Sequence, residues 1–460
     1  MAELRLSELA EKMKGTILQG DPSFKFQDYN IDSRQIKKGS LFFALKDQRD
    51  GHDFIPDAVK NGAKGVVVSE KVPFIDKKTA CIQVENTLEA LQRLAHQVLR
   101  EHPVQVIGIT GSTGKTTTKE FTAALLKNKF RVLKSHGNFN NHIGLPLSLL
   151  KLNKKHQIAV LEYGMSHSGE ISTLTRIARP DVAVICNVYP VHMEFFGNIN
   201  EIAAAKKELL DNMNPNGTSV LNGDQPLVLN MIKTLKKSPV LFGLTDKCDV
   251  RATNIQVHSL EEMAFDFHYK GHHSRTTIPF SNKGYLYNFL AAAAAASVLS
   301  VPFKKILKTG KKLKPSDKRG EVLSLPNNIK IINDTYNSNP AALREALKSL
   351  SLQKGGRKVA VLGDMLELGE KQINYHTAAG KSVVENKIDF LITIGPLAKY
   401  IAEGALISGM DPENIVSFEL SEEAAEKIPN LLKEKDFVLI KGSRGVKTEK
   451  IVNILKKEGN

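Results

Sequence analysis

The sequence predicts an α/β protein built from two or three domains, and three observations support this prediction. Its 460 residues exceed what one hydrophobic core usually supports. Its content of 42% hydrophobic and 25% charged residues is ordinary for a soluble globular protein. Short apolar runs alternate with helical stretches along the chain, which is the pattern of a parallel sheet with crossover helices.

The N-terminal block, residues 1–80, mixes short strands with a helix. Residues 41–45 and 65–68 are apolar runs that predict buried strands. The N-terminus has no basic region followed by an apolar stretch, so it does not indicate a secretory signal.

The next block begins with a helix expected over residues 88–100, which Pro103 ends. A strand is expected over residues 104–109. The apolar runs at residues 158–161 and 182–185 extend the same parallel sheet.

A lysine-rich segment ending at Pro315 is interpreted as a linker. The alanine run at residues 291–296 is expected inside a tightly packed helix. Strand candidates beyond the linker alternate with helical stretches and predict a further α/β domain. They lie at residues 329–332, 359–362, 390–394 and 437–440.

Net charge and cysteines limit the classes of partner. The formal net charge is +15, but no basic stretch interleaved with aromatic residues forms a base-stacking platform. We interpret the charge as a solvated basic surface, with attraction of acidic substrates as a minor benefit and no nucleic-acid partner. The three cysteines, Cys81, Cys186 and Cys248, are widely spaced, which argues against disulfides or zinc and favours the cytoplasm. No apolar run approaches the roughly 20 residues that span a bilayer, so no stable membrane insertion is expected.

A glycine-rich loop follows the strand expected at residues 104–109. Its residues are Gly111, Ser112, Thr113, Gly114, Lys115, Thr116 and Thr117. Glycines let successive backbone N–H groups turn toward phosphate oxygens, and the start of the following helix adds unpaired donors. Lys115 would bridge the β- and γ-phosphates, and Thr116 would hold Mg²⁺ through its hydroxyl. Ile109 stands where the full nucleotide-binding pattern has its first glycine, so the loop is a shortened form. The alternative is a glycine-rich turn with a surface lysine.

Motifs after this loop occur in an order that resembles the Mur ligase family over nearly the whole chain. They are the runs at residues 137–146, 162–164, 168–170, 186–188 with His192, 205–208 and 221–224. The resemblance implies a UDP-substrate domain over residues 1–80, a central ATP-binding domain with a phosphate loop over 81–313, and a C-terminal Rossmann-like ligase domain over 314–460.

The C-terminal region resembles the family members that add D-alanyl-D-alanine. Its signatures are residues 333–340, read Asn-Asp-Thr-Tyr-Asn-Ser-Asn-Pro, residues 361–369 with His376, and residues 441–444. Residues 32–34 and 50–54 match the family at the N-terminus. The resemblance implies an ATP-dependent ligase that joins D-alanyl-D-alanine to UDP-N-acetylmuramoyl-tripeptide through an acyl phosphate, in peptidoglycan precursor synthesis. It also implies that ATP and Mg²⁺ take part, and we expect a monomer.

The resemblance also assigns roles to individual residues. The catalytic residues would be Lys115, His192 and Lys206. Outside the phosphate loop, Asn288 would contact adenine, Arg319 the γ-phosphate, and Asp334 the ribose. The metal ligands would be Thr116, Glu162, His192 and Lys206, the last as a carbamate formed with CO₂. The substrate-binding residues would be Ser33, Arg34, Asn140, Asn141, Asn337 and Asn339.

Each of these roles has a plain structural alternative. Lys206 and Lys207 could both be surface lysines, Asn288 could pack a helix, and Asp32 with Ser33 could form a turn. The stretch Asn282-Lys283-Gly284-Tyr285 also departs from the family's Gly-x-His-Asn run, which bears on the contacts to the nucleotide base.

Two other functions compete with this interpretation. Another Mur enzyme or a folylpolyglutamate synthetase-like ligase would share the phosphate loop, but residues 333–340 and the N-terminal block argue against it. A P-loop ATPase acting on nucleic acid is permitted by the charge, although no motor motif is present.

Overall fold

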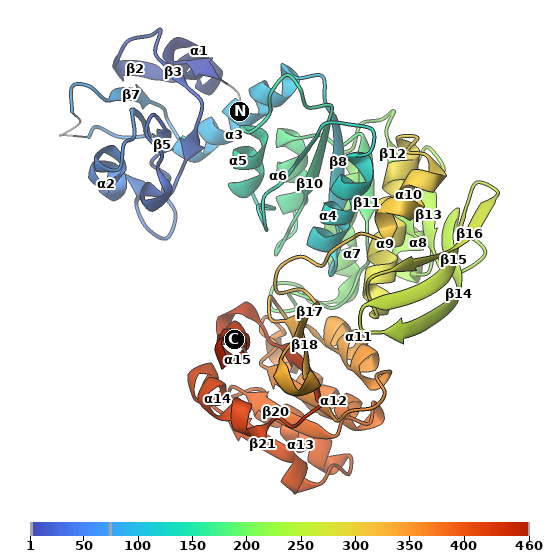
Figure 1. Ribbon diagram of the computed structural model, residues 1–460. Coiled ribbons are helices and arrows are strands. Elements are labelled where there is room, and N and C mark those ends of the chain that lie inside the picture. The colour runs from blue at the N-terminus through green and yellow to red at the C-terminus, as the bar shows by residue number, and fades with distance from the viewer. Residues whose placement is uncertain (1–2, 73–75, 459–460) are drawn as a thin grey trace. The chain divides into compact units, whose positions relative to one another are not determined.

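A computed structural model describes residues 3–72 and 76–458 (Figure 1). The N-terminal region forms a five-stranded sheet of order β2-β7-β6-β5-β4 and a two-stranded sheet of β1 and β3. Strands β4 to β7 pair in parallel, and β2 is an antiparallel edge. The strands are β1 Leu4–Arg5, β2 Thr16–Gln19, β3 Lys25–Phe26, β4 Tyr29–Asn30, β5 Leu41–Phe43, β6 Gly65–Val68 and β7 Ala80–Gln83, and the helices are α1 Leu6–Met13 and α2 Ile55–Lys60. Every residue of β5 and β6 is buried, which explains their continuous apolar sequence.

The central region contributes a nine-stranded sheet of order β16-β15-β14-β13-β12-β11-β8-β10-β9. Its strands are β8 Gln105–Thr110, β9 Val132–Lys134, β10 Ile158–Glu162, β11 Val182–Ile185, β12 Thr218–Asn222, β13 Val240–Gly243, β14 Val250–Ser259, β15 Glu262–Tyr269 and β16 His272–Ile278. Its helices are α3 Thr87–Arg100, α4 Lys115–Leu126, α5 Gly144–Leu149, α6 Glu170–Ile177, α7 Ile199–Asp211, α8 Pro226–Leu229, α9 Lys283–Val298 and α10 Phe303–Gly310. The expected strands and the helix that Pro103 follows are confirmed. The antiparallel meander β14-β15-β16 was not predicted.

The C-terminal region forms a six-stranded sheet of order β17-β18-β22-β19-β20-β21. All its pairings are parallel except the antiparallel edge strand β17. The strands are β17 Glu321–Ser324, β18 Lys330–Asp334, β19 Lys358–Gly363, β20 Phe390–Ile394, β21 Ile415–Phe418 and β22 Phe437–Lys441. The helices are α11 Pro340–Ser351, α12 Gln372–Glu385, α13 Lys399–Ile407, α14 Ser421–Lys427 and α15 Glu449–Glu458.

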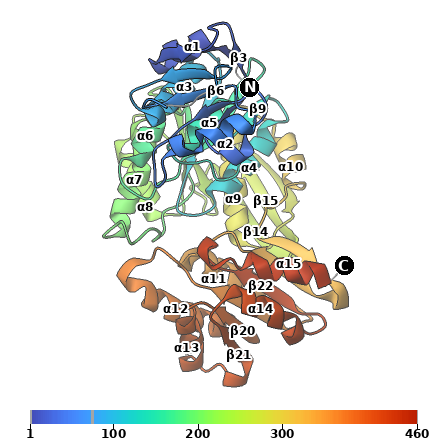
Figure 2. The same cartoon turned by 90° about the vertical axis from the view of Figure 1, so that its left-hand side faces the viewer.

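Helices cover both faces of this C-terminal sheet (Figure 2). Helices α11, α12 and α13 supply one apolar core, in which Leu347, Val383 and Ile401 are fully buried. Helices α14 and α15 supply the other, with Ala424 and Ile451 fully buried. This two-layered cover is the arrangement expected for a Rossmann-like domain.

The lysine-rich segment before Pro315 is not a linker, as the sequence had suggested, because residues 303–310 form helix α10. Ile306 in this helix and Leu313 just after it are buried, while the lysines point outward. Apolar residues at this spacing give the segment an inward face, and the run of lysines obscured that signal. The alanine run at residues 291–296 does lie in a helix, α9, and all six alanines are fully buried, as expected.

Backbone contacts divide the chain into two compact units. The first comprises Met1–Thr110, Lys129–Val184 and Ala205–Ser219, and the second comprises Gly111–Asn128, Ile185–Ala204 and Val220–Asn460. Cys81, Cys186 and Cys248 are all buried thiols in this structure. Among the described residues, no helix has the length and apolar character needed to cross a membrane.

Candidate active site

The phosphate loop turns the chain from the end of β8 into helix α4. Gly114 has φ of 78°, a left-handed conformation that glycine adopts without steric cost. Helix α4 starts at the next residue, Lys115, so its first backbone N–H groups lack helical acceptors and can bind an anion. The Lys115 Nζ donates to the carbonyl of Gly111 at 2.9 Å, which holds the ammonium over the loop. This geometry can hold a phosphate chain.

The segment after strand β11 clamps the loop. The Asn187 side chain accepts from the Thr113 N–H at 2.8 Å through Oδ1 and donates to the Thr113 carbonyl at 3.0 Å through Nδ2. The Ser112 hydroxyl donates to the Tyr189 carbonyl at 2.9 Å and accepts from the Tyr189 N–H at 2.8 Å. Asn187 lies in the run at residues 186–188 that resembles the family, but the sequence predicted no role for it. Its position directly after a buried strand was the signal that could have identified it.

Asn288 lies beneath the loop. A Cβ added at Gly114 would come within 2.2 Å of the Asn288 Oδ1, and the same oxygen accepts from the Thr118 hydroxyl at 3.3 Å. Asn288 is buried on helix α9. Asn288 therefore packs against the loop, and its contact with adenine stays a prediction.

Glu162 ends strand β10 and is only 2% exposed. Its Oε1 accepts from the Asn140 Nδ2 at 2.9 Å, and its backbone N–H donates to the Ser135 hydroxyl at 3.1 Å. Asn141 instead holds the start of helix α5, because its Oδ1 accepts from the Gly144 N–H at 2.8 Å. A carboxylate fixed at the carboxyl end of a parallel strand is well placed for a hard cation.

Helix α7 separates the two adjacent lysines. Lys206 is 2% exposed, whereas Lys207 is half-buried and pairs with Asp211. Glu208 fixes α7 against the start of α6, since its carboxylate accepts from the Gly169 N–H at 2.7 Å and from the Ser172 N–H at 2.9 Å. Successive helical residues point about 100° apart, so this anchor turns Lys206 inward and Lys207 outward.

His192 contacts a motif that is distant in sequence. Its Nδ1 lies 2.6 Å from the Glu367 Oε2, and the hydrogen bond from His192 lowers the pKa of Glu367. Both residues have positive φ, 55° and 62°, which is uncommon outside glycine and costs free energy. A carboxylate on Nδ1 leaves Nε2 as the ring nitrogen directed elsewhere, the arrangement typical of metal-binding histidines. The sequence did not identify Glu367 as a partner of His192.

The turn between β18 and α11 is held by hydrogen bonds from Lys441, at the end of β22, and by a cap on α11. Lys441, 2% exposed, donates to the Asp334 Oδ2 at 2.6 Å and to the Asn337 carbonyl at 2.9 Å. The Asn339 Oδ1 accepts from the Ala342 N–H at 2.9 Å and caps α11. The expectation that Asn337 and Asn339 order this turn is confirmed. Nearby, the Arg319 guanidinium lies 3.7 Å from the centre of the Tyr336 ring.

A pocket with about 390 Å³ of empty space, open solvent included, lies beside Asp334. Its lining residues are Leu260, Phe280, Ser281, Asn282, Tyr285, Gly320, Val322, Ile332, Asp334, Ala346 and Ser349. The rings of Phe280 and Tyr285 stack with centres 4.7 Å apart, and the Tyr285 hydroxyl donates to the Arg319 carbonyl. Burial raises the pKa of Tyr285, so this hydroxyl keeps its proton. The cavity itself has a volume of only about 30 Å³, so in this conformation it has no room for a nucleoside.

Ser33 and Arg34 lie in a short 3₁₀ helix, Ser33–Gln35, in the N-terminal region. Arg34 is exposed and binds the Asp32 carboxylate through two nitrogens, each at 2.9 Å. This pair lowers the pKa of Asp32 to about 2. Asp32 also accepts from the Arg34 N–H, so the turn-forming role of this segment is confirmed.

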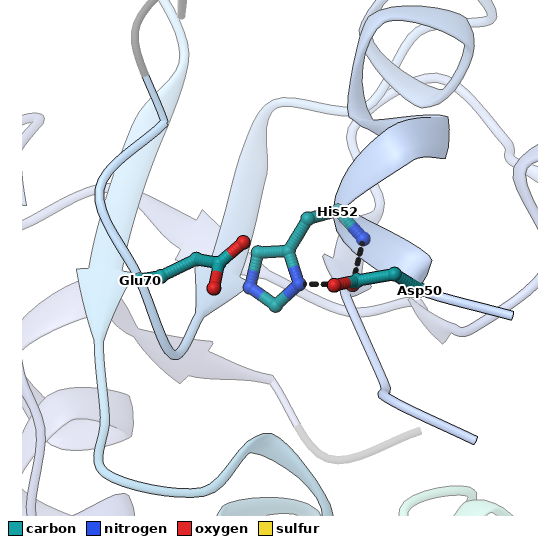
Figure 3. A group of neighbouring side chains, drawn as sticks. All are labelled: Asp50, His52 and Glu70. Atoms are coloured by element: carbon teal, nitrogen blue, oxygen red, sulfur yellow. Dashed lines mark hydrogen bonds and ion pairs between the residues drawn. The ribbon is translucent and has the colours of Figure 1, made fainter.

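Asp50, His52 and Glu70 form the one group of three possible metal ligands in the described part of the chain (Figure 3). Both ring nitrogens of His52 are engaged, because Nδ1 lies 2.6 Å from the Asp50 Oδ1 and Nε2 accepts from the Ser69 N–H at 3.0 Å. Lys46 pairs with both carboxylates. The group is therefore a structural network that fixes the loop and is poorly suited to a metal.

The family models match three parts of the chain. They are the "Mur ligase family, catalytic domain" over residues 25–98, the "Mur ligase middle domain" over 109–296, and the "Mur ligase, glutamate ligase domain" over 318–444. The chain belongs to the Mur ligase family, and a P-loop motor acting on nucleic acid is thereby excluded as its class.

Similar proteins point to one branch of that family. The UDP-N-acetylmuramoyl-tripeptide–D-alanyl-D-alanine ligase of Bacillus subtilis (strain 168) is 36% identical over 460 residues, 99% of each chain. The crystal structure of MurF from Acinetobacter baumannii has a TM-score of 0.89 at 29% identity and covers 99% of each chain. MurF from Thermotoga maritima in complex with ADP has a TM-score of 0.81 at 31% identity, covering 94% of this chain and 97% of that one. The expected three-domain α/β architecture is confirmed.

Proposed function

We propose that this ligase joins D-alanyl-D-alanine to UDP-N-acetylmuramoyl-tripeptide at the expense of ATP, releasing ADP and phosphate. The observation that carries the proposal is similarity over 99% of the chain to a relative whose name states this activity. The phosphate loop supports it, because its geometry suits a triphosphate.

The reaction proceeds in two steps. A peptide carboxylate attacks the γ-phosphorus of ATP, which gives an acyl phosphate and releases ADP. The amine of D-alanyl-D-alanine then attacks the acyl carbonyl, loses a proton and expels phosphate. Lys115 and the N–H groups at the start of α4 stabilise the charge that develops on the transferring phosphate.

The nucleotide binds the phosphate loop through its phosphates, with its ribose toward Asp334. Asp334 binds the ribose, Arg319 approaches the γ-phosphate, and Tyr285 forms a wall beside the base. Asn288, buried beneath Gly114, packs against the loop and would contact adenine from there.

Magnesium fits the residues that the family resemblance assigns to it. Glu162 is a buried carboxylate and Thr116 a buried hydroxyl, and Mg²⁺ prefers such oxygen ligands. His192 would bind through Nε2, because Nδ1 faces Glu367. When bound, the ion neutralises charge on the phosphates.

Lys206 is the candidate for carbamate formation. Its amine would add CO₂ and lose a proton, which gives an anion whose two oxygens can bind a second Mg²⁺. The burial of Lys206 supports this role, because its side chain points into the protein and not into solvent.

The two substrates bind at different regions. Ser33 and Arg34 contact the UDP portion, Asn140 and Asn141 the muramoyl peptide, and the turn with Asn337 and Asn339 borders the D-alanyl-D-alanine site. The corresponding domains comprise residues 1–80, 81–313 and 314–460.

We place the monomeric enzyme in the cytoplasm, which suits its three buried thiols.

Phosphate release tests the proposal. The release should require both the UDP-tripeptide and D-alanyl-D-alanine. Tripeptides that end in lysine and tripeptides that end in diaminopimelate are each assayed. Equal turnover with free L-amino acids in place of the dipeptide would refute the specificity, and turnover without the UDP-tripeptide would refute the ligase assignment.

A further inference from the structure

Positive charge is concentrated in one acid-free part of the chain. Residues 267–316 contain eight lysines, one arginine and no aspartate or glutamate, whereas the whole chain has a net charge of +15. These 50 residues therefore carry more than half of the net charge. The proposed ligase chemistry uses none of these cations.

Helix α10 presents three of these lysines to solvent. Lys304, Lys305 and Lys308 are exposed and lie within an arc of about 100° on one side of the helix. Ile306, on the opposite side, is fully buried. The side of α10 that faces water is thus a strip of ammonium groups above an apolar contact.

Two contacts extend this strip to neighbouring elements (Figure 1). The Lys305 Nζ donates to the Asn128 carbonyl at 3.1 Å, and Asn128 donates to the Thr309 hydroxyl at 2.7 Å, so α10 lies against the end of α4. The ring of Phe303 lies 5.5 Å from that of His272, beside the β15–β16 turn.

We call the resulting patch the α10 surface. Its exposed lysines are Lys127, Lys270, Lys304, Lys305, Lys308, Lys311, Lys312 and Lys314. Across residues 3–72 and 76–458, none of these eight forms an ion pair with a carboxylate. The positive potential of the α10 surface is therefore not compensated locally.

We propose that the α10 surface binds the anionic surface of a lipid bilayer, peripherally and by electrostatics alone. Clusters of four to eight lysines on an amphipathic helix suffice for such binding, and each lysine near an anionic bilayer strengthens it roughly fivefold. No insertion is involved, because the apolar side of α10 is already packed against the protein.

Nucleic acid suits this surface less well. Phe303 is the sole aromatic residue of the segment 299–316, and its ring stacks inward on Phe267 at 5.5 Å, so no platform for bases is present there. All cationic residues of the segment 299–316 are lysines. They lack the planar guanidinium group that favours paired contacts with a phosphate. A planar anionic surface requires only many charges facing one way.

Vesicle sedimentation tests the proposal with the full-length protein. Vesicles of phosphatidylcholine, with or without phosphatidylglycerol, are compared at low and at physiological salt. The wild type should sediment only with the phosphatidylglycerol vesicles, and less at the higher salt. A variant with Lys304, Lys308, Lys311 and Lys312 changed to Gln should bind roughly 600-fold more weakly, at about fivefold for each lysine.

A matched variant controls for net charge. Lys348, Lys354, Lys399 and Lys433 are exposed lysines outside the α10 surface, and changing all four to Gln removes the same charge. This variant should bind vesicles like the wild type, and both variants should release phosphate normally. Equal loss of binding in the two variants, no binding by the wild type, or tighter binding to RNA than to vesicles at the same salt would each overturn the proposal.

Discussion

Helices α7 and α10 carry lysines in opposite surroundings. On α7, Lys206 is 2% exposed, because Glu208 fixes the helix against the start of α6. On α10, Lys304 and Lys308 are exposed and have no acidic partner. The way a helix packs therefore decides what its lysines can do, although the residue type is the same. A buried lysine can take part in a reaction, whereas an exposed lysine can only attract anions over a distance.

The largest effect should come from a lysine held inside the site. Lys115→Ala should reduce phosphate release by on the order of 10³-fold, because the ammonium over the loop stabilises the transferring phosphate. The variant should unfold at the same denaturant concentration as the wild type, since Lys115 is only half-buried. Near-normal turnover would show that Lys115, like the exposed lysines of α10, takes no part in the reaction.

The pair on α7 provides the sharpest test of the comparison. Lys206→Ala should lose activity by about 10²-fold or more, and small carboxylic acids should partly restore it by supplying oxygens in place of the carbamate. Lys207→Ala should be nearly neutral, because Lys207 forms an exposed pair with Asp211. Steady-state kinetics of the two variants decide the matter: the reverse result would mean that the assignment is shifted by one residue.

A structural lysine should give a smaller effect, chiefly on stability. Lys441→Met should lower the free energy of unfolding by about 2–3 kcal/mol, because it removes the partner of Asp334 and a bond to the Asn337 carbonyl. Urea denaturation measures the change. Asp334→Asn with Lys441→Met should recover part of the loss, since no charge is then left unpaired, and failure to recover would contradict the ion-pair explanation.

The anchor of α7 should show the smallest effect. Glu208→Gln should lower the free energy of unfolding by about 1–2 kcal/mol, because the amide has one acceptor oxygen and its nitrogen cannot accept the two hydrogen bonds that the second carboxylate oxygen accepts at the start of α6. It should also reduce turnover by displacing Lys206. Asp211→Asn, on the exposed side of the same helix, serves as the control and should change neither quantity.

The sequence predicted the parts of the fold that depend on local patterns. Residues 65–68 became strand β6, and the alanine run became part of the buried helix α9, because apolar runs report burial directly. The meander β14-β15-β16 was missed because its pattern alternates only partly. Helix α10 was taken for a linker because its lysines hide two or three apolar positions.

The site shows the same division. The phosphate loop is a contiguous motif, so its residues could be named from the sequence. Asn187, which clamps Thr113, and Glu367, which contacts His192, act across long stretches of chain, and no local pattern records such pairs. The roles of Asp334 and Lys206 rest on resemblance, and the structure adds the burial of Lys206 and the Lys441 partner of Asp334.

The closeness of Gly114 and Asn288 has a consequence for how this sequence can vary during evolution. A side chain at position 114 would collide with the Asn288 Oδ1 at 2.2 Å, so substitution there is tolerated only when position 288 becomes smaller. Even then, the φ of 78° disfavours residues other than glycine and, to a lesser degree, asparagine. The two positions should therefore covary among homologues, with glycine at 114 wherever a side chain as long as asparagine occupies 288, although they are far apart in the chain.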